Sequence, residues 1–418
     1  MNSVPRRVVV TGMGLITPLG SDEETVWNAM MQKHCGIRRL TLVNPDDYKT
    51  PVGGEVDSKA IPAMLREAGV EPVGDRTVDL ALASAGAALR SAGIGAGCGS
   101  SGPVPMPVIF GSGIGASHSM YHAFEAFFQK GVRGLRPTSV PRCMGNAISA
   151  QISIKFRLSG PNYVIVSACT SSTTAIGVSF RMVRDGYADC ALCGGTDSVF
   201  DPFVYAGWNN LGVMSKNPDP LSACRPFDSR RDGCVLGEGA GALVIESLER
   251  AAARGARIRG EILGYGESSD ASHITSPSVE GQVRAILDAM SSAGVAAGDI
   301  GFINAHGTAT RANDECESKS ITAALGPAAA SVPTASSKSF FGHLLGAAGA
   351  VETIVTFLGL ERGMMPPNLN LDEPDPGCNL CLARGEAVKL KSPVAMKNSF
   401  GFGGNNAVLI LRGWEERK

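Results

Sequence analysis

The feature that most constrains the fold of this chain is an internal repeat. Residues 163–169 form a β-branched run that passes through a turn of small residues into a helical pattern, and residues 333–349 show the same succession. A second pair, residues 237–245 and 403–410, consists in each case of a glycine-rich turn followed by a hydrophobic run. Two repeats in the same order predict a duplicated body.

The same pattern indicates the fold class and the division of the chain. Short β-branched runs alternate with longer helical patterns throughout, which is typical of an α/β fold with largely buried strands. The charged, glycine-punctuated stretch 249–260 predicts that the halves meet near residue 255, giving units 1–255 and 256–418. The helical pattern at 344–358 is rich in glycine and alanine, so we expect it to pack closely on both sides as a central layer.

Composition excludes several classes of protein. Of the 418 residues 44% are hydrophobic and 18% charged, and the formal net charge is −1, which disfavours a disordered polyelectrolyte and a nucleic-acid coat. The eleven cysteines are scattered, which favours a reducing cytoplasm without disulfides. The most apolar helical pattern is too short for a membrane span. Gly12, Gly14 and Pro18 interrupt the first apolar run, so no signal peptide is expected.

Cys169 is the first candidate for chemistry. It lies where a predicted strand ends and a predicted helix begins, and the unsatisfied amides of a helix N-terminus favour a thiolate. Small neighbours leave room for a substrate to reach the sulfur. The alternative is a small buried hydrophobic side chain, which is the common state of a free cysteine.

His306 and His343 are the second candidates, each predicted at the exit of a strand in the C-terminal half. A neutral imidazole offers one donor and one acceptor, and it can bind a thioester carbonyl while negative charge develops there. A satisfied core histidine is the alternative for each. Lys338, flanked by Ser337 and Ser339, is either a buried cation that tunes its neighbours or a solvated charge.

Three further patterns carry less weight. Residues 398–406 read as a flexible loop with Phe400 and Phe402, or as a glycine-rich hairpin with core phenylalanines. The glycines of 111–115 lack the spacing of a dinucleotide loop. The Cys-x-x-Cys pairs at 190/193 and 378/381 raise the alternative of zinc, but residues three apart on a strand, as predicted for the first pair, point to opposite faces. Neither nucleotide nor metal is expected.

Together these motifs closely resemble the β-ketoacyl-acyl-carrier-protein synthases, in particular the elongating type II enzymes of bacterial fatty-acid synthesis. The resemblance runs from Arg7 to about Leu411 and rests on S-A-C-T-S at 167–171, N-A-H-G-T-A-T at 304–310, K-S-F-F-G-H-L-L-G-A-A-G at 338–349 and N-S-F-G-F-G-G at 398–404. It implies a thiolase-like fold of duplicated halves in five layers, α-β-α-β-α, usually a homodimer, with no cofactor.

The resemblance also implies the reaction and the roles of residues. Cys169 would accept an acyl group from an acyl carrier protein, and His306 and His343 would bind malonyl thioester and stabilise the enolate left by decarboxylation. The amides of Cys169 and Phe402 would form an oxyanion hole, with Phe402 as a gate. The pair Lys338 and Glu352 would be the buried charges near the site.

Other positions concern the substrate. The resemblance implies pantetheine contacts at Thr275, Thr308 and Thr310, and acyl-pocket positions at Ile114, Trp208 and Phe400. The chain departs from the family's usual residues at Trp208, at Ser139 and at 404–406, which suggests a reshaped pocket. The basic docking patch for the carrier is thinned to four candidates, which favours a dedicated carrier protein: Arg66, Arg76, Arg133 and Arg136.

Three alternative functions stay open at this point. One is the ketosynthase of a specialised polyketide, polyene or unusual-lipid pathway. Another is a non-condensing partner subunit, although such subunits typically lack the cysteine that this chain has at 169. The last is a coenzyme A thiolase, which needs a second cysteine in the C-terminal loop, where this chain has Phe400 and Phe402.

Overall fold

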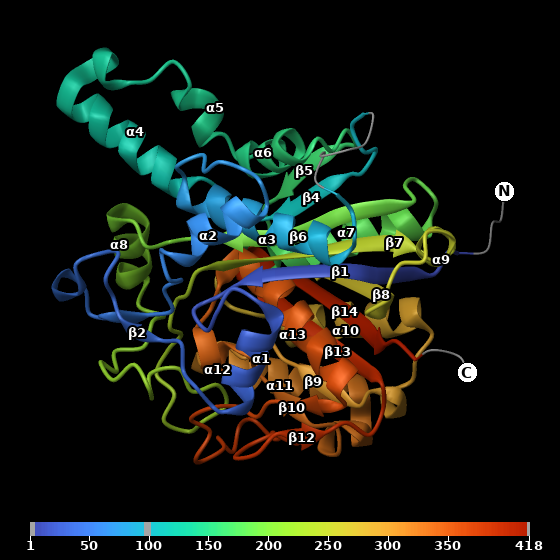
Figure 1. Cartoon of the computed structure of the whole chain (residues 1–418). Helices are drawn as coiled ribbons and strands as arrows, with labels where there is room; N and C mark the ends of the chain where they lie inside the picture. The colour runs from blue at the N-terminus through green and yellow to red at the C-terminus, as the bar shows by residue number, and fades with distance from the viewer. Residues whose placement is uncertain (1–4, 96–101, 416–418) are drawn as a thin grey trace.

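The computed structural model describes residues 5–95 and 102–415 and is built around one large sheet (Figure 1). Its ten strands follow the order β10-β9-β13-β14-β8-β1-β7-β6-β4-β5. Five of them come from the N-terminal half and five from the C-terminal half. Within each half the order is the same when strands are numbered along the chain, namely third, second, fourth, fifth, first. The repeated topology confirms the predicted duplicated α/β body.

The two groups of strands are hydrogen-bonded to each other rather than fully separate. β1 and β8 pair antiparallel at three positions, beginning with Val8 opposite Ile262. The expected two sheets are therefore joined at their first strands. The N-terminal strands are β1 (Val8–Ile16), β4 (Val108–Gly111), β5 (Asn162–Ile165), β6 (Cys190–Asp197) and β7 (Gly239–Ser247). The C-terminal strands are β8 (Gly260–Ser269), β9 (Phe302–Asn304), β10 (Thr334–Ala335), β13 (Val394–Gly401) and β14 (Asn405–Gly413).

Helices form three further layers. The central layer is α7 (Ser171–Arg184) with α13 (Ala348–Arg362), and both contact strands of both halves. Outside the N-terminal strands lie α2 (Ala60–Glu67), α3 (Arg76–Ser91) and α6 (Ala147–Phe156), and outside the C-terminal strands lie α10 (Val279–Ala293) and α11 (Arg311–Leu325). The result is the five-layer α-β-α-β-α arrangement that the family resemblance implies.

Small residues allow the central layer to form. A Cβ added to Gly349 of α13 would lie 2.1 Å from Thr173 Oγ1 of α7, and one added to Gly346 would lie 2.4 Å from the backbone nitrogen of Gly113. Both distances are shorter than any real contact, so a larger side chain at 349 would force the two helices apart, and one at 346 would push the turn before α13 away from the segment after β4. The glycine- and alanine-rich pattern near residue 344 therefore reflects close packing, as predicted.

One local prediction needs correction. His343 does not leave a strand, because it follows the short helix α12 (Lys338–Phe341). For residues 398–406 the structure has the glycine-rich hairpin rather than the flexible loop: the end of β13, a 3₁₀ turn at Phe402–Gly404 and the start of β14, which pairs antiparallel with β13.

The segment containing α4 (Ser117–Lys130) and α5 (Ser139–Cys143) projects from the body of the molecule (Figure 1). On α4, Phe124 is 56% and Phe128 is 81% exposed. Smaller elements complete the chain: α1 (Glu23–Met31), β2 (Arg38–Arg39), β3 (Val52–Gly53), α8 (Pro202–Leu211), α9 (Leu248–Ala253), β11 (Met364–Met365) and β12 (Val388–Lys389). Among the described residues, no helix is both long and apolar enough to cross a bilayer.

Candidate active site

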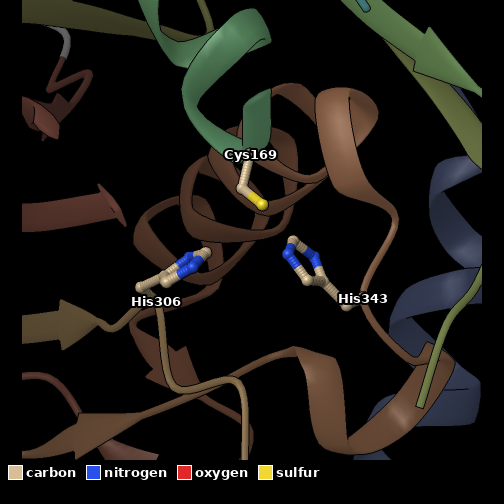
Figure 2. Close-up of side chains that lie close together, drawn as sticks. All are labelled: Cys169, His306 and His343. Atoms are coloured by element: carbon tan, nitrogen blue, oxygen red, sulfur yellow. The ribbon is translucent and has the colours of Figure 1, made fainter. Parts of the chain in front are cut away.

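Three side chains from distant parts of the chain meet at the centre of the molecule. Cys169 of the N-terminal half faces His306 and His343 of the C-terminal half across a small space (Figure 2). The sulfur and one ring nitrogen of each histidine all lie within 4.8 Å of one another. All three residues are more than nine-tenths buried. A thioester carbon beside the sulfur would therefore lie within reach of both imidazoles.

A strained turn presents Cys169. Ala168 has a φ of 54°, a left-handed conformation that costs a non-glycine residue energy. The Ser171 side chain holds this turn, because its hydroxyl donates to the carbonyl of Ala168 and accepts from the amide of Ser167 at 2.9 Å. The cysteine thus lies in the 3₁₀ turn that leads into α7.

The charge state of Cys169 differs from the prediction. Burial raises the pKa of the thiol to about 12, although Lys338 and the backbone amides of Phe402 and Cys169 oppose this rise. Burial therefore outweighs the helix terminus, and the resting group at neutral pH is a thiol rather than a thiolate. Its proton must leave when the sulfur attacks. The same two amides point toward the sulfur, where they can stabilise an oxyanion.

Hydrogen bonds fix the tautomer of His343. Its Nδ1 accepts a bond from the amide of Leu345 at 3.2 Å, so in the neutral ring the proton is on Nε2. No protein group among the described residues bonds this buried Nε2, which leaves the N–H available to a ligand. Burial, then the positive charges of Lys338 and Lys397, lower the pKa of His343 well below its ordinary value.

His306 has the same tautomer for a different reason. Its Nδ1 lies 3.4 Å from the ammonium of Lys338, which can only donate, so the ring proton is again on Nε2. Glu317 of α11 accepts from the amides of His306 at 2.7 Å and of Gly307 at 2.8 Å, which anchors the loop after β9. Burial, Lys338, His343 and Lys397 hold the pKa of His306 well below its ordinary value. The site thus presents two neutral donors.

Lys338 and Glu352 form a buried ion pair behind the histidines. Lys338 Nζ lies 2.6 Å from Glu352 Oε1, and the side chains are 1% and 0% exposed. Lys338 thus connects the carboxylate of α13 to the ring of His306 and lies outside the cavity itself.

Most of the predicted substrate-binding residues line one cavity with the three central side chains. Its walls include Thr275, Thr308, Thr310, Trp208, Phe400 and Phe402. Trp208 stacks on Phe402 with ring centroids 5.8 Å apart, and Phe400 meets His306 edge-on at 6.0 Å. Ile114 is not part of this wall, since it is 38% exposed and its amide turns toward Asp197.

One candidate of the carrier docking patch also differs in its surroundings. Arg76 is not a free surface charge, because its guanidinium pairs with buried Glu238 and donates to the carbonyl of Val56 at 2.8 Å. Ser139 lies on α5 and accepts from the amide of Arg136 at 3.0 Å. Arg66, Arg133 and Arg136 are exposed.

Three residues around the site escaped the sequence analysis. Cys234 lines the cavity beside Cys169. Glu317 anchors His306, and Lys397 on β13 contacts Glu352. The only signal for Lys397 was a charge within the apolar run 394–400.

A metal ion would fit the three central groups by distance, but the ammonium of Lys338 and the raised pKa of the thiol, about 12, both oppose a cation there.

Comparison with known proteins agrees with this geometry. Residues 5–251 match the family "Beta-ketoacyl synthase, N-terminal domain" and residues 259–372 match "Beta-ketoacyl synthase, C-terminal domain". The chain is 37% identical over 99% of its length to the whole of 3-oxoacyl-[acyl-carrier-protein] synthase 2 of Synechocystis. It is 38% identical over 98% of its length to 99% of the enzyme of the same name from Staphylococcus aureus strain COL.

Solved structures of ketosynthases also resemble this chain over almost its whole length. The ishigamide ketosynthase/chain length factor superposes with a TM-score of 0.90 at 35% identity, covering 98% of this chain and 100% of that one. A beta-ketoacyl synthase from Burkholderia phymatum also gives 0.90, at 34% identity and the same coverage. A type II polyketide ketosynthase, solved with its acyl-carrier protein, gives 0.88 at 27% identity, again covering 98% and 100%. The chain belongs to the beta-ketoacyl synthase family.

Proposed function

We propose that this protein is a 3-oxoacyl-acyl-carrier-protein synthase that extends acyl chains by two carbons in fatty-acid synthesis. The observation that carries the proposal is the convergence of one thiol and two neutral imidazole donors on one cavity. The enzymes of that name in Synechocystis and Staphylococcus aureus match almost the whole chain, which supports the assignment. The presence of Cys169 argues against a non-condensing subunit.

In the first half-reaction Cys169 attacks the thioester of an acyl carrier protein. The bond between the acyl carbon and the carrier sulfur breaks, the acyl–Cys169 bond forms, and the thiol proton of Cys169 passes to the departing carrier thiolate. The amides of Cys169 and Phe402 stabilise the oxyanion of the tetrahedral intermediate. Both histidines keep a pKa well below the ordinary value, so they stay neutral while this proton is transferred.

In the second half-reaction the malonyl thioester oxygen accepts both Nε2–H groups. The bond to the carboxylate carbon breaks, CO₂ leaves, and its electron pair becomes an enolate that the two donors stabilise. The enolate carbon attacks the acyl–Cys169 carbonyl, and the intermediate expels the Cys169 thiolate, which takes up one proton. Acyl and malonyl thioesters plus one proton thus yield 3-oxoacyl thioester, CO₂ and the free carrier thiol.

Substrate contacts follow from the cavity wall. We assign Thr275, Thr308 and Thr310 to the pantetheine arm, because all three residues line the cavity that contains the two histidines. Phe402 is the gate, and the stacked Trp208 holds it closed in the resting state. Ile114 and the acyl channel would join the cavity only when this pair moves. A reshaped channel keeps a specialised polyketide or polyene pathway as the second candidate.

We infer that two copies of the chain form the working unit. β5 is the last strand of the sheet, and Tyr163 and Val166 beside its free edge are 53% and 64% exposed. Unpaired strand edges and exposed apolar helices such as α4 are typical of interfaces. A twofold partner would cover both. We also infer units 1–255 and 256–418, since β7 ends at Ser247 and β8 begins at Gly260.

Analytical ultracentrifugation checks this interface. We expect a particle of about twice the 43.3 kDa chain mass. Val166→Glu places a charge at the strand edge and is expected to shift the population to monomer. The control is Tyr187→Glu, which changes a residue that is 83% exposed and lies outside the proposed interface, and it should leave the population unchanged. A monomeric wild-type protein would overturn the dimer.

The ten cysteines in the described ranges are free thiols, which supports a cytoplasmic site of action.

The function is tested by incubating the protein with acyl and malonyl carrier proteins. Intact-mass analysis of the carrier should detect the 3-oxoacyl product, with one CO₂ released per product. A panel of acyl chain lengths separates the candidates, because an elongating enzyme accepts saturated chains while a specialised ketosynthase prefers unsaturated or oxidised ones. No product with any chain would reject the proposal.

A further inference from the structure

A second buried lysine lies behind the active site and has no role in the reaction as described so far. Lys397 is in β13, a strand between β9 and β14, and its side chain is 0% exposed. Its ammonium donates to the carbonyl of Asn398 at 2.9 Å and to the Ser399 hydroxyl, and lies 3.4 Å from Thr173 Oγ1. Burying a cation so completely is costly unless the charge is paired and hydrogen-bonded, so its partners decide what it does.

Lys397 and Lys338 share one carboxylate. Lys338 Nζ lies 2.6 Å from Glu352 Oε1, and Lys397 Nζ lies 2.9 Å from Glu352 Oε2. An ammonium thus lies beside each oxygen of Glu352. The contact with Lys397 is an ion pair without hydrogen-bond geometry, and its attraction opposes rotation of the carboxylate toward Lys338 alone. Lys338 therefore keeps its position 3.4 Å from Nδ1 of His306, which sets the tautomer of that ring.

β13 reaches the same histidine by a second route. The residue after Lys397 is Asn398, whose side-chain amide donates to Glu317 Oε1 at 3.2 Å. Glu317 in turn accepts from the amide of His306. The other titratable groups that act on Lys397 or respond to it come from the surrounding elements: Glu352 of α13, Lys338 of α12, Glu317 of α11, and His306 and His343 at the cavity.

We propose that Lys397 is a positioning residue for the condensing reaction: its ammonium holds Glu352 from the side opposite Lys338, which keeps Lys338 at Nδ1 of His306 and leaves the Nε2–H of that ring as a donor to the enolate. The proposal rests on the condensing function proposed above. It concerns the second half-reaction, in which negative charge develops next to the imidazoles. Acyl transfer uses the amides of Cys169 and Phe402 at the sulfur rather than the imidazoles, so it should depend little on Lys397.

A pH dependence follows. Burial, assisted by the like charge of Lys338 and opposed by Glu352, lowers the pKa of Lys397 to about 8. A lysine is cationic below its pKa, so Lys397 is charged at pH 7 and loses its charge as the pH rises through about 8. Condensation in the wild-type protein should then decline across that range while the acylated Cys169 itself does not titrate.

The test compares wild type with Lys397→Met in single-turnover condensation that starts from pre-acylated enzyme. At pH 7 we expect the variant to condense about tenfold more slowly, with an unchanged rate of Cys169 acylation. Its rate should lack the decline near pH 8. Lys397→Met should fold, because Lys338 and Glu352 remain as a balanced pair, and Lys397→Gln is assayed in parallel. Lys391→Met, an exposed lysine shortly before β13, is the matched control.

The possible results distinguish a positioning role of Lys397 from a structural one. Loss confined to condensation together with a flattened pH profile supports the proposal. An unchanged pH profile, or equal losses in acylation and condensation accompanied by a lower unfolding midpoint, would assign Lys397 a structural role only. Failure of the wild-type protein to condense at any pH would instead reject the proposed function, so the two failures are distinguishable.

Discussion

Replacing Cys169 with alanine is expected to lower the rate of condensation by at least about 10⁴-fold, because the acyl group then has no covalent carrier. The histidines, their tautomers and the cavity stay in place, so the variant should still release CO₂ from malonyl carrier protein without forming a 3-oxoacyl product. The measurement is product formation and CO₂ release in parallel on the same samples.

Cys234→Ala is the matched control for this experiment. Cys234 is the other thiol that lines the cavity, and burial raises its pKa to about 12, as it does for Cys169. Among the described residues, the cluster that includes His306 and His343 contains Cys169 and not Cys234. We expect the control to retain condensation within about tenfold of the wild-type rate. Equal losses in the two variants would contradict the assignment of the nucleophile.

Glu352→Gln is expected to destabilise the protein by about 3–5 kcal/mol, because it leaves two buried ammonium groups without the carboxylate that they share. Glu317 does not replace it, since its oxygens accept from the amides of His306 and Gly307 and from Asn398. The free energy of unfolding in urea measures the effect. Where the variant is too unstable to purify, a soluble yield far below that of wild type shows the loss of stability.

The control for this prediction is Glu386→Gln. Glu386 pairs with Lys33 at 2.6 Å, the same distance as Glu352 with Lys338, but its side chain is 86% exposed. Solvent screens an exposed pair, so we expect no measurable change in stability. Similar losses for the two variants would show that burial does not determine the effect.

Much of the site could be predicted from sequence because it is encoded in short motifs. The residues around Cys169, His306 and His343 are contiguous strings, and the repeat pairs 163–169 with 333–349, which lead into the central helices α7 and α13. A duplicated fold places such equivalent positions near each other, so convergence followed from topology.

The remaining features depend on tertiary structure. The thiol of Cys169 was expected to be ionised because a helix N-terminus is visible in sequence, whereas burial, which reverses that expectation, is not. Lys397 lies in a strand covered on both faces, so the alternation that marks a strand is lost and its charge has no visible partner. The ladder between β1 and β8 likewise joins segments far apart in the chain.

The most direct test of the account is peptide mapping of the protein after incubation with an acyl carrier protein alone. The acyl mass should appear on the peptide that contains Cys169, and subsequent addition of malonyl carrier protein should remove it as the 3-oxoacyl product forms. An acyl group on a different cysteine, or one on Cys169 that malonyl carrier protein does not discharge, would contradict the central claim that one sulfur and two imidazoles act on a single thioester.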